Sequence, residues 1–237
     1  MMWNGKRKAL TFSYDDGVDT DRRLAQIFDR YGMKCTFNLN GGKLVTAETQ
    51  GAPWKLNPKT PWKNPDALIN RLPIEEMLES YKNHEIAVHS YTHPHLENLS
   101  REECTNEIAQ DIARLTEVFG CTPIGMAYPY GSYSDTVVEV LQEQGIRYAR
   151  TTRTTHSFAP QRDLLRFHPT CHHRDAQLMA LAKQFIEAEP EEPMLFYVWG
   201  HSYEFAGDDN WDIIERFCAY MADRDDIFYG TNTEVLL

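Results

Sequence analysis

Short apolar runs of strand length alternate along this chain with amphipathic segments of helix length. This alternation predicts a parallel sheet covered by helices, which is the α/β class of fold. The strands are expected at residues 9–14, 34–39, 85–88, 124–127, 146–149, 164–167, 194–199 and 227–229. The helices are expected at residues 19–31, 100–119, 134–144, 176–188 and 211–222.

Two adjacent carboxylates follow the first predicted strand, in the sequence Asp15-Asp16-Gly17. An isolated pair of this kind would indicate an ordinary turn, because aspartate side chains hydrogen-bond readily to nearby backbone. Adjacent acids repel each other, however, and burying either one is costly unless a cation or a proton compensates. The pair therefore suggests that one carboxylate binds a metal ion while the other keeps an oxygen free for proton transfer.

Two histidines, His89 and His93, follow the predicted strand 85–88. One aspartate and two histidines form a suitable ligand set for zinc or a similar divalent ion, with positions left open for water and substrate. Pro94 disfavours helical geometry at His93, so we expect a turn that directs both imidazoles inward. No glutamate stands between the two histidines, which excludes the HExxH pattern of zinc proteases.

Two later motifs complete a resemblance to a known family. Asp15-Asp16-Gly17, His89-x3-His93, Tyr128-Pro129-Tyr130-Gly131 and Trp199-Gly200-His201 occur in the order of the polysaccharide deacetylase family, also called NodB-homology or carbohydrate esterase family 4. The chain resembles this family from about residue 9 to about residue 202. The resemblance implies a single domain over residues 1–237, an α/β fold that is a distorted (β/α) barrel of about seven parallel strands. The chemistry of such barrels lies at the C-terminal ends of the strands, where these motifs fall.

The resemblance also implies a role for individual residues. The family uses the first aspartate of the pair as a base, the second aspartate and the two histidines as metal ligands, and a late histidine as an acid. The corresponding assignments are Asp15 as base, Asp16, His89 and His93 as ligands, and His201 as acid. The metal is expected to be Zn²⁺, with Co²⁺, Ni²⁺ or Mn²⁺ as alternatives.

The third motif departs from the family pattern. The backbone N–H of Tyr130 is expected to help hold the tetrahedral oxyanion. The family usually carries an arginine two residues before the proline, where it braces the catalytic aspartate, but this chain has Ala127 there. We expect Arg166, in the predicted strand 164–167, to replace it, although a surface salt bridge would explain Arg166 equally well. The acidic residue that orients the late histidine is not recognisable in the sequence.

The segment of residues 43–72 interrupts the alternation of strands and helices. It contains four prolines together with Trp54 and Trp62, and it shows no helix or strand periodicity. Long connections without secondary structure inside a compact domain are usually functional or disordered. The two tryptophans favour an insertion loop folded over the mouth of the active site, where an aromatic face can stack on a sugar ring.

Composition restricts the partners and the compartment. A formal net charge of −11 without an offsetting basic cluster argues against nucleic acid or an anionic membrane surface as partner. It gives no reason to expect a strongly acidic polymer as substrate, although a local basic groove could exist. The five cysteines are widely spaced and lack a CxxC pair, which favours reduced thiols. The N-terminus lacks the apolar segment of a signal peptide, so we expect a cytoplasmic protein, or a secreted one if a leader was removed.

The motifs together predict a metal-dependent hydrolase that removes N-acetyl groups from an acetamido sugar, oligosaccharide or polysaccharide. An O-acetyl esterase, a deformylase or a cyclic-amide hydrolase could use the same metal site, because specificity resides in the loops. A non-catalytic carbohydrate-binding protein is the remaining alternative. Ala127 favours that alternative, whereas the complete set of expected catalytic residues argues against it. The sequence does not indicate the oligomeric state.

Overall fold

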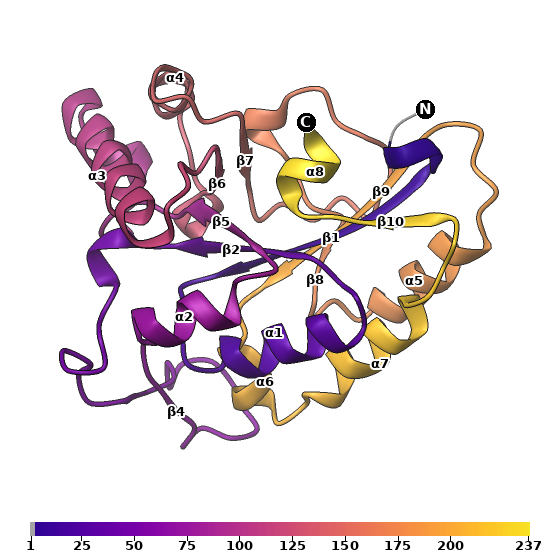
Figure 1. Ribbon diagram of the computed structural model, residues 1–237, viewed down its shortest axis with the longest axis horizontal. Coiled ribbons are helices and arrows are strands. Elements are labelled where there is room, and N and C mark those ends of the chain that lie inside the picture. Colours follow the sequence, from indigo (N-terminus) through magenta and orange to yellow (C-terminus); the bar gives the residue numbers. More distant parts are fainter. Residues whose placement is uncertain (1–2) are drawn as a thin grey trace.

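A curved parallel sheet of eight strands forms the centre of the molecule in the computed structural model, which describes residues 3–237 (Figure 1). Seven strands follow the order β7-β6-β5-β2-β1-β9-β8, and β10 pairs with β1 beside this path. On one edge of β1, the strand β9 pairs with nearly its whole length. The strands β2 and β10 therefore share the opposite edge of β1. The strands are β1 (Lys8–Asp15), β2 (Cys35–Leu39), β5 (Glu85–Val88), β6 (Gly125–Ala127), β7 (Tyr148–Arg150), β8 (Cys171–His172), β9 (Met194–Gly200) and β10 (Ile227–Tyr229).

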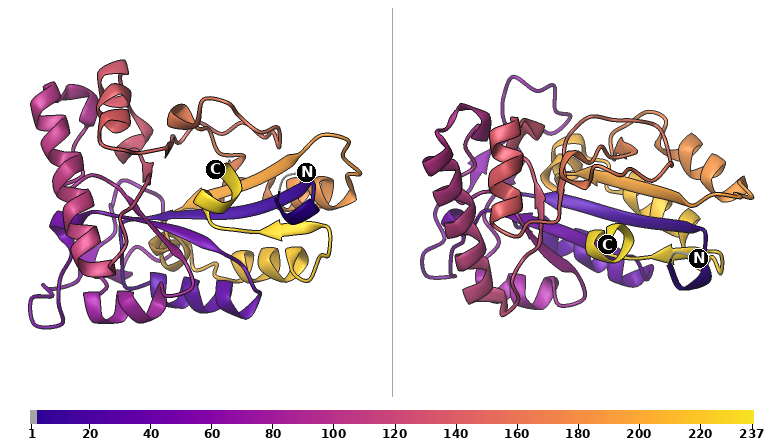
Figure 2. Two further views of the ribbon diagram at one scale, coloured as in Figure 1. Left: turned by 45° about the horizontal axis from the view of Figure 1, so that its top comes forward. Right: turned by 90° about the horizontal axis from the view of Figure 1, so that it is seen from above.

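Helices surround this sheet, with α1, α2, α5, α6 and α7 along one side and α3 and α4 beyond its β5–β7 end (Figures 1 and 2). The longest of them, α3, begins with a capping box between Ser100 and Glu103 and ends at Gly120, whose φ of 71° suits glycine. Within residues 3–237, no helix combines the length and the apolar character needed to cross a membrane. The helices are α1 (Asp21–Arg30), α2 (Ile74–Ser80), α3 (Arg101–Phe119), α4 (Asp135–Glu143), α5 (Leu178–Glu187), α6 (Tyr203–Asp208), α7 (Asp212–Met221) and α8 (Asn232–Leu236).

The main core lies between the sheet and the helices on this side. Phe12 of β1 packs on Phe28 of α1 with ring centroids 4.4 Å apart, and its edge meets Phe217 of α7 at 5.8 Å. All three rings are fully buried, so they fix the helices against the central strand. The central strand β1 is thereby held rigidly, and its C-terminal end becomes a fixed support for the residues that follow it.

One predicted strand is absent. Residues Leu164–Arg166 form a 3-10 turn, and only Phe167 bridges to the sheet, beside Arg150 of β7. The Arg166 side chain pairs with Asp163 three residues earlier, an arrangement that suits a turn rather than an extended chain. The expected strand 164–167 is therefore wrong, and this segment fills the space between β7 and β8 without pairing along its length.

The segment 43–72 is more ordered than its sequence indicates. It contains a short antiparallel pair, β3 (Trp54–Lys55) and β4 (Leu68–Ile69), packed on its own small apolar cluster with Val18. Backbone hydrogen bonds attach it to the chain just after β1, through Leu72 N–H to the Gly17 carbonyl and Asp19 N–H to the Asn70 carbonyl. Another joins Asn64 N–H to Gly207 of α6. The insertion is thus fastened across one end of the sheet.

Candidate active site

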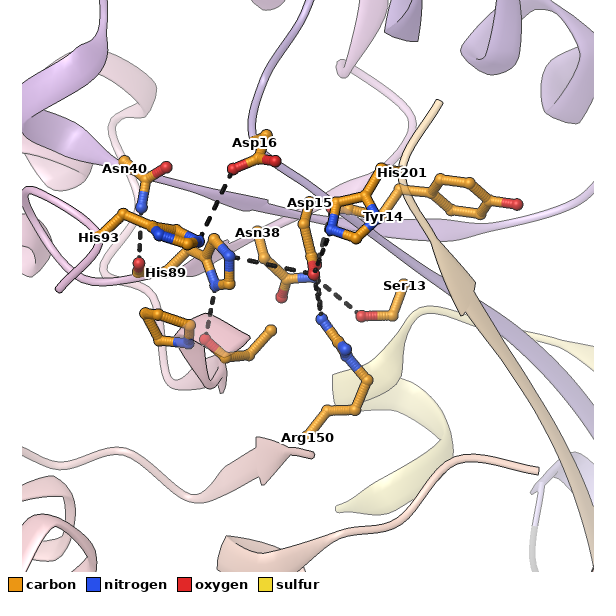
Figure 3. A network of polar contacts seen from close by, with 12 residues as sticks. Ser13, Tyr14, Asp15, Asp16, Asn38, Asn40, His89, His93, Arg150 and His201 are labelled. Atoms are coloured by element: carbon orange, nitrogen blue, oxygen red, sulfur yellow. Dashed lines mark hydrogen bonds and ion pairs between the residues drawn. The ribbon is translucent and has the colours of Figure 1, made fainter. Parts of the chain in front are cut away.

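The residues singled out by the motifs meet at the C-terminal end of the sheet. Asp15 is the last residue of β1 and Asp16 follows it, His89 follows β5, and His201 follows β9. Tyr130 lies in a 3-10 turn after β6. Figure 3 shows the two aspartates and the histidines directed toward one another from these separate strands. Parallel strands end at the same edge of a sheet, and this edge carries the chemistry in (β/α) barrels.

Asp16, His89 and His93 form the candidate metal centre. One ligand atom of each lies within 4.8 Å of those of the other two. The 89–93 segment is a turn and not a helix, with φ of 61° at Ser90 and 66° at His93, while Asp16 has a φ of 84°. Left-handed backbone at residues other than glycine is costly and occurs typically at functional sites. The turn brings both imidazoles to the carboxylate, as the position of Pro94 predicts.

The protonation of these histidines fits a divalent ion. His89 Nδ1 lies 2.7 Å from the carbonyl oxygen of Ala127, so this nitrogen donates and Nε2 carries the lone pair. Burial lowers the pKa of both histidines, to about 4 for His93, so both imidazoles are neutral at pH 7. Neutral imidazole is the form that binds metal, and an adjacent carboxylate supplies the negative charge. The residues present therefore fit a zinc-type site with one carboxylate and two imidazoles.

Asp15 is braced by Arg150, a residue that the sequence did not single out. Arg150 Nη2 lies 2.6 Å and 2.5 Å from the two carboxylate oxygens, and Asn38 Nδ2 donates to Asp15 Oδ1 at 2.8 Å. Burial alone would raise the pKa of Asp15, but the charge of Arg150, together with smaller contributions that include the protonated His201, outweighs it and lowers the pKa. The Asp15 carboxylate is therefore buried and ionised.

The prediction that Arg166 braces Asp15 is wrong. Arg166 Nη2 lies 2.7 Å from Asp135 and its Nη1 lies 3.0 Å from Asp163, both near the surface. Arg166 lies in the 3-10 turn and pairs with those two carboxylates, whereas Arg150, at the last position of β7, reaches Asp15. The sequence holds one signal that points to Arg150: it is a charged residue that directly follows the apolar residues Tyr148 and Ala149.

His201 contacts a carboxylate on each side. Its Nε2 lies 3.8 Å from Asp15 Oδ2, and its Nδ1 lies 3.4 Å from Glu204 Oε2. Burial lowers the pKa of His201, but Glu204 first and then Asp15 raise it, to about 9 overall. Glu204 stands three residues after His201 in α6, and it is the acidic partner that the sequence did not reveal. His201 is thus protonated at neutral pH.

Glu204 is the centre of a second group of polar side chains. His172 Nε2 lies 3.0 Å and His173 Nε2 lies 3.4 Å from its Oε2. The ligand atoms of His172, His201 and Glu204 are close enough for a metal ion. The Arg174 guanidinium, however, lies 3.7 Å from the same carboxylate and disfavours a further cation there. We therefore read this group as a network that fixes Glu204.

Two cavities meet at this site. The inner one, of about 290 Å³, is bordered by both aspartates, the histidine pair, Tyr130 and His201. The Tyr130 side chain is exposed and stacks on His95 with ring centroids 3.9 Å apart, and the residue borders this cavity. The oxyanion role of the Tyr130 N–H stays a prediction.

The outer cavity, of about 580 Å³, lies under the insertion 43–72. Trp54 and Trp62 both border it, together with Asp16 and His93 of the candidate metal centre. Both tryptophans thus border the same cavity as two of the candidate metal ligands. Their role in substrate binding stays a prediction.

Comparison with known proteins identifies a family for this chain. A family model described as polysaccharide deacetylase matches residues 4–149. Chitin deacetylase 1 of Cryptococcus neoformans var. grubii is 30% identical over 73 residues, which are 30% of this chain and 16% of that protein. The chain therefore matches less than a fifth of the length of this curated relative.

Solved structures share the fold at low sequence identity. The Xyl-CE4 domain of a multidomain xylanase from the hindgut metagenome of Trinervitermes trinervoides has a TM-score of 0.60 and 17% identity, over 97% of this chain and 89% of that chain. A CE4 family pseudoenzyme from Bacillus anthracis has a TM-score of 0.55 and 18% identity, over 98% and 66%. The predicted distorted (β/α) barrel is confirmed. Since a pseudoenzyme has the same fold, activity must be argued from this chain's own residues.

Proposed function

Because this chain belongs to the polysaccharide deacetylase family, we propose that it is a metal-dependent hydrolase that removes N-acetyl groups from an acetamido sugar, oligosaccharide or polysaccharide. The observation that supports this most strongly is the meeting of a buried, ionised aspartate and a protonated histidine beside the Asp16, His89 and His93 set. A general base, a general acid and a candidate metal centre then face one cavity.

Asp16, His89 and His93 would hold a divalent ion, with Zn²⁺ the first expectation from the donor types. When bound, such an ion activates a water molecule and polarises a carbonyl oxygen as a Lewis acid. Asn40 supports this centre by donating from Nδ2 to the backbone carbonyls of His89 (2.6 Å) and Ser90 (2.9 Å). It holds the strained turn in the conformation that presents the imidazoles.

Asp15 acts as the general base. Arg150 and Asn38 occupy much of its carboxylate, and they keep it ionised and fixed in orientation. Its Oδ2 faces the cavity between His89 and His201, at 4.0 Å and 3.8 Å from their Nε2 atoms. A water molecule that attacks the acyl carbon from this side would lose its proton to Oδ2.

His201 acts as the general acid through Nε2. Glu204 keeps it protonated at neutral pH, so a proton is available for the leaving group. An amide requires this proton more than an ester does, because an amine anion is a much poorer leaving group than an alkoxide. A histidine that is protonated at neutral pH therefore supports cleavage of an amide, the bond whose leaving group most needs a proton.

Acetate release tests the proposal. Purified protein is incubated with N-acetylated chitooligosaccharides and with O-acetylated xylan, each with and without a chelator. We expect release from the N-acetyl substrate, loss with chelator, and recovery on addition of Zn²⁺ or Co²⁺. Release from the O-acetyl substrate alone would select the esterase alternative. Carbohydrate binding without any release would select the non-catalytic one.

A further inference from the structure

The outer cavity is lined with positive charge although the chain as a whole is acidic. Its wall includes Lys43, Lys55, Arg71 and Arg174. The same lining also carries the carboxylates of Asp16 and Glu204, so four cations against two carboxylates leave a formal charge of +2, whereas the whole chain carries −11. Charge of one sign that lines a cleft attracts ligands of the opposite sign.

Two of these cations already have partners. Lys55 Nζ lies 2.6 Å from Asp66 at the surface, and Arg174 Nε lies 2.8 Å from Asp208. Lys43 and Arg71 differ, because within residues 3–237 neither forms an ion pair with a carboxylate. The cavity therefore presents two cations whose charge is not offset by a protein ion pair.

Arg71 is held in place by other contacts. Its guanidinium donates to the backbone carbonyl of Asp16 and lies 5.3 Å from the centre of the Trp54 ring. These contacts alone would give Arg71 a structural role, but they do not account for the presence of Lys43 in the same cavity wall. Burial, and then the nearby charge of Arg71, lower the pKa of Lys43, and the charges of Asp16 and Glu107 offset this only in part. An anion bound beside both side chains would offset this repulsion.

We propose that the outer cavity binds an anionic group, a carboxylate or a phosphate, on the acetylated sugar or on its neighbour, through Lys43 and Arg71. This rests on the proposed deacetylase function and adds a substrate class to it, acidic acetamido sugars in preference to neutral ones. Asp16 and His93 line the same cavity, so the anion is recognised next to the reacting acetamide. Trp54 and Trp62 supply apolar faces for the sugar rings.

Three probes with a common acetamido group test the preference: neutral N-acetylglucosamine, its 6-phosphate, and N-acetylmuramic acid, which carries a carboxylate. For metal-loaded protein, kcat/KM for acetate release and the Kd from calorimetry are measured for each. We expect at least one anionic probe to be favoured by about tenfold or more in kcat/KM and Kd. The two anionic probes distinguish phosphate from carboxylate. Rising ionic strength should reduce the preference, because salt screens the attraction.

Variants assign the preference to the two cations. Lys43→Gln should remove most of it, whereas Arg71→Lys, which keeps the charge, should retain part of it. Lys55→Gln is the matched control, since it removes a paired charge from the same wall and should leave the preference intact.

The outcomes separate this inference from the proposed function. Acetate release with equal preference for neutral and anionic probes, or a preference unchanged in Lys43→Gln, would overturn the anion site while the deacetylase stands. Binding of anionic probes that depends on Lys43 but without acetate release would support the anion site and overturn the deacetylase. No binding of any probe would overturn the anion site.

Discussion

Replacing Glu204 by glutamine tests whether the Glu204 carboxylate keeps His201, the proposed general acid, protonated. Glu204 Oε2 lies 3.4 Å from His201 Nδ1, and its charge is the largest contribution that raises the histidine pKa. Glutamine keeps the size and a hydrogen-bonding group at this position but removes the charge. The pKa of His201 should therefore fall, and the enzyme should lose its acid at a lower pH.

The magnitude follows from the geometry. The pKa of His201 is about 9, compared with an ordinary value of 6.5, and each pKa unit corresponds to about 1.4 kcal/mol. A unit charge at about 4 Å contributes roughly 4 kcal/mol at an effective dielectric constant of about 20, which is an upper bound here. Asp15 remains to support the protonated form after the substitution. We therefore expect the His201 pKa to fall by about one to two units.

The assay is the pH dependence of kcat/KM for acetate release. His201 must be protonated to act, so wild-type activity should persist up to about pH 9 and fall above it. In Glu204→Gln this basic limb should move about one to two units toward lower pH, and an NMR titration of His201 should show the same shift. Asp208→Asn is the matched control in the same helix, because Asp208 pairs with Arg174 and not with His201. An unchanged basic limb in Glu204→Gln would refute the reasoning.

Three further substitutions probe the rest of the site. Asp15→Asn should keep the metal content and the fold but lower kcat by about 10²–10⁴-fold, because an amide cannot accept the proton; near-normal turnover would exclude Asp15 as the base. His93→Ala should lose most of the bound metal in elemental analysis, and an anomalous signal at His172 and Glu204 instead would contradict the ligand assignment. Arg150→Met leaves the Asp15 charge buried without a partner, so it should lower the free energy of unfolding at pH 7 by about 3–5 kcal/mol. That loss should shrink as the pH falls through the lowered pKa of Asp15, since the stabilisation exists only while the carboxylate is ionised.

The sequence predicts the regular part of the fold well where local signals are strong. The strands Glu85–Val88 and Ile227–Tyr229 occur with the expected bounds, and the capping box at Ser100 marks the start of α3. The weak elements were missed: α2, α6 and β8 are short, and β3 and β4 have two residues each. A strand of two residues has no periodicity to detect, and its pairing is decided by tertiary contacts.

At the functional site, too, local sequence patterns predict some residues, whereas others depend on tertiary contacts. The motif residues lie close together because each follows a strand, which local patterns can place. Arg150 meets Asp15 across 135 residues of sequence, so only the order of strands in the sheet determines that it is the brace. Arg166 was a reasonable alternative from sequence because it also lies near the end of an apolar run. Glu204 is local to His201, but its role depends on α6, a helix that the sequence did not predict.

The left-handed backbone at the metal centre lowers the stability of the fold, but it positions residues that the function needs. Asp16, Ser90, His93 and Tyr130 have φ between 58° and 84°, a region that costs a side-chain-bearing residue roughly 1 kcal/mol relative to glycine. Selection for thermal stability alone would therefore favour glycine at these positions. At Asp16 and His93, such a change would remove a ligand from the candidate metal centre. Variants recovered from a stability screen of this chain should thus be checked for metal binding first. The glycine substitutions that remove most backbone strain at Asp16 and His93 also remove ligands of the candidate metal centre.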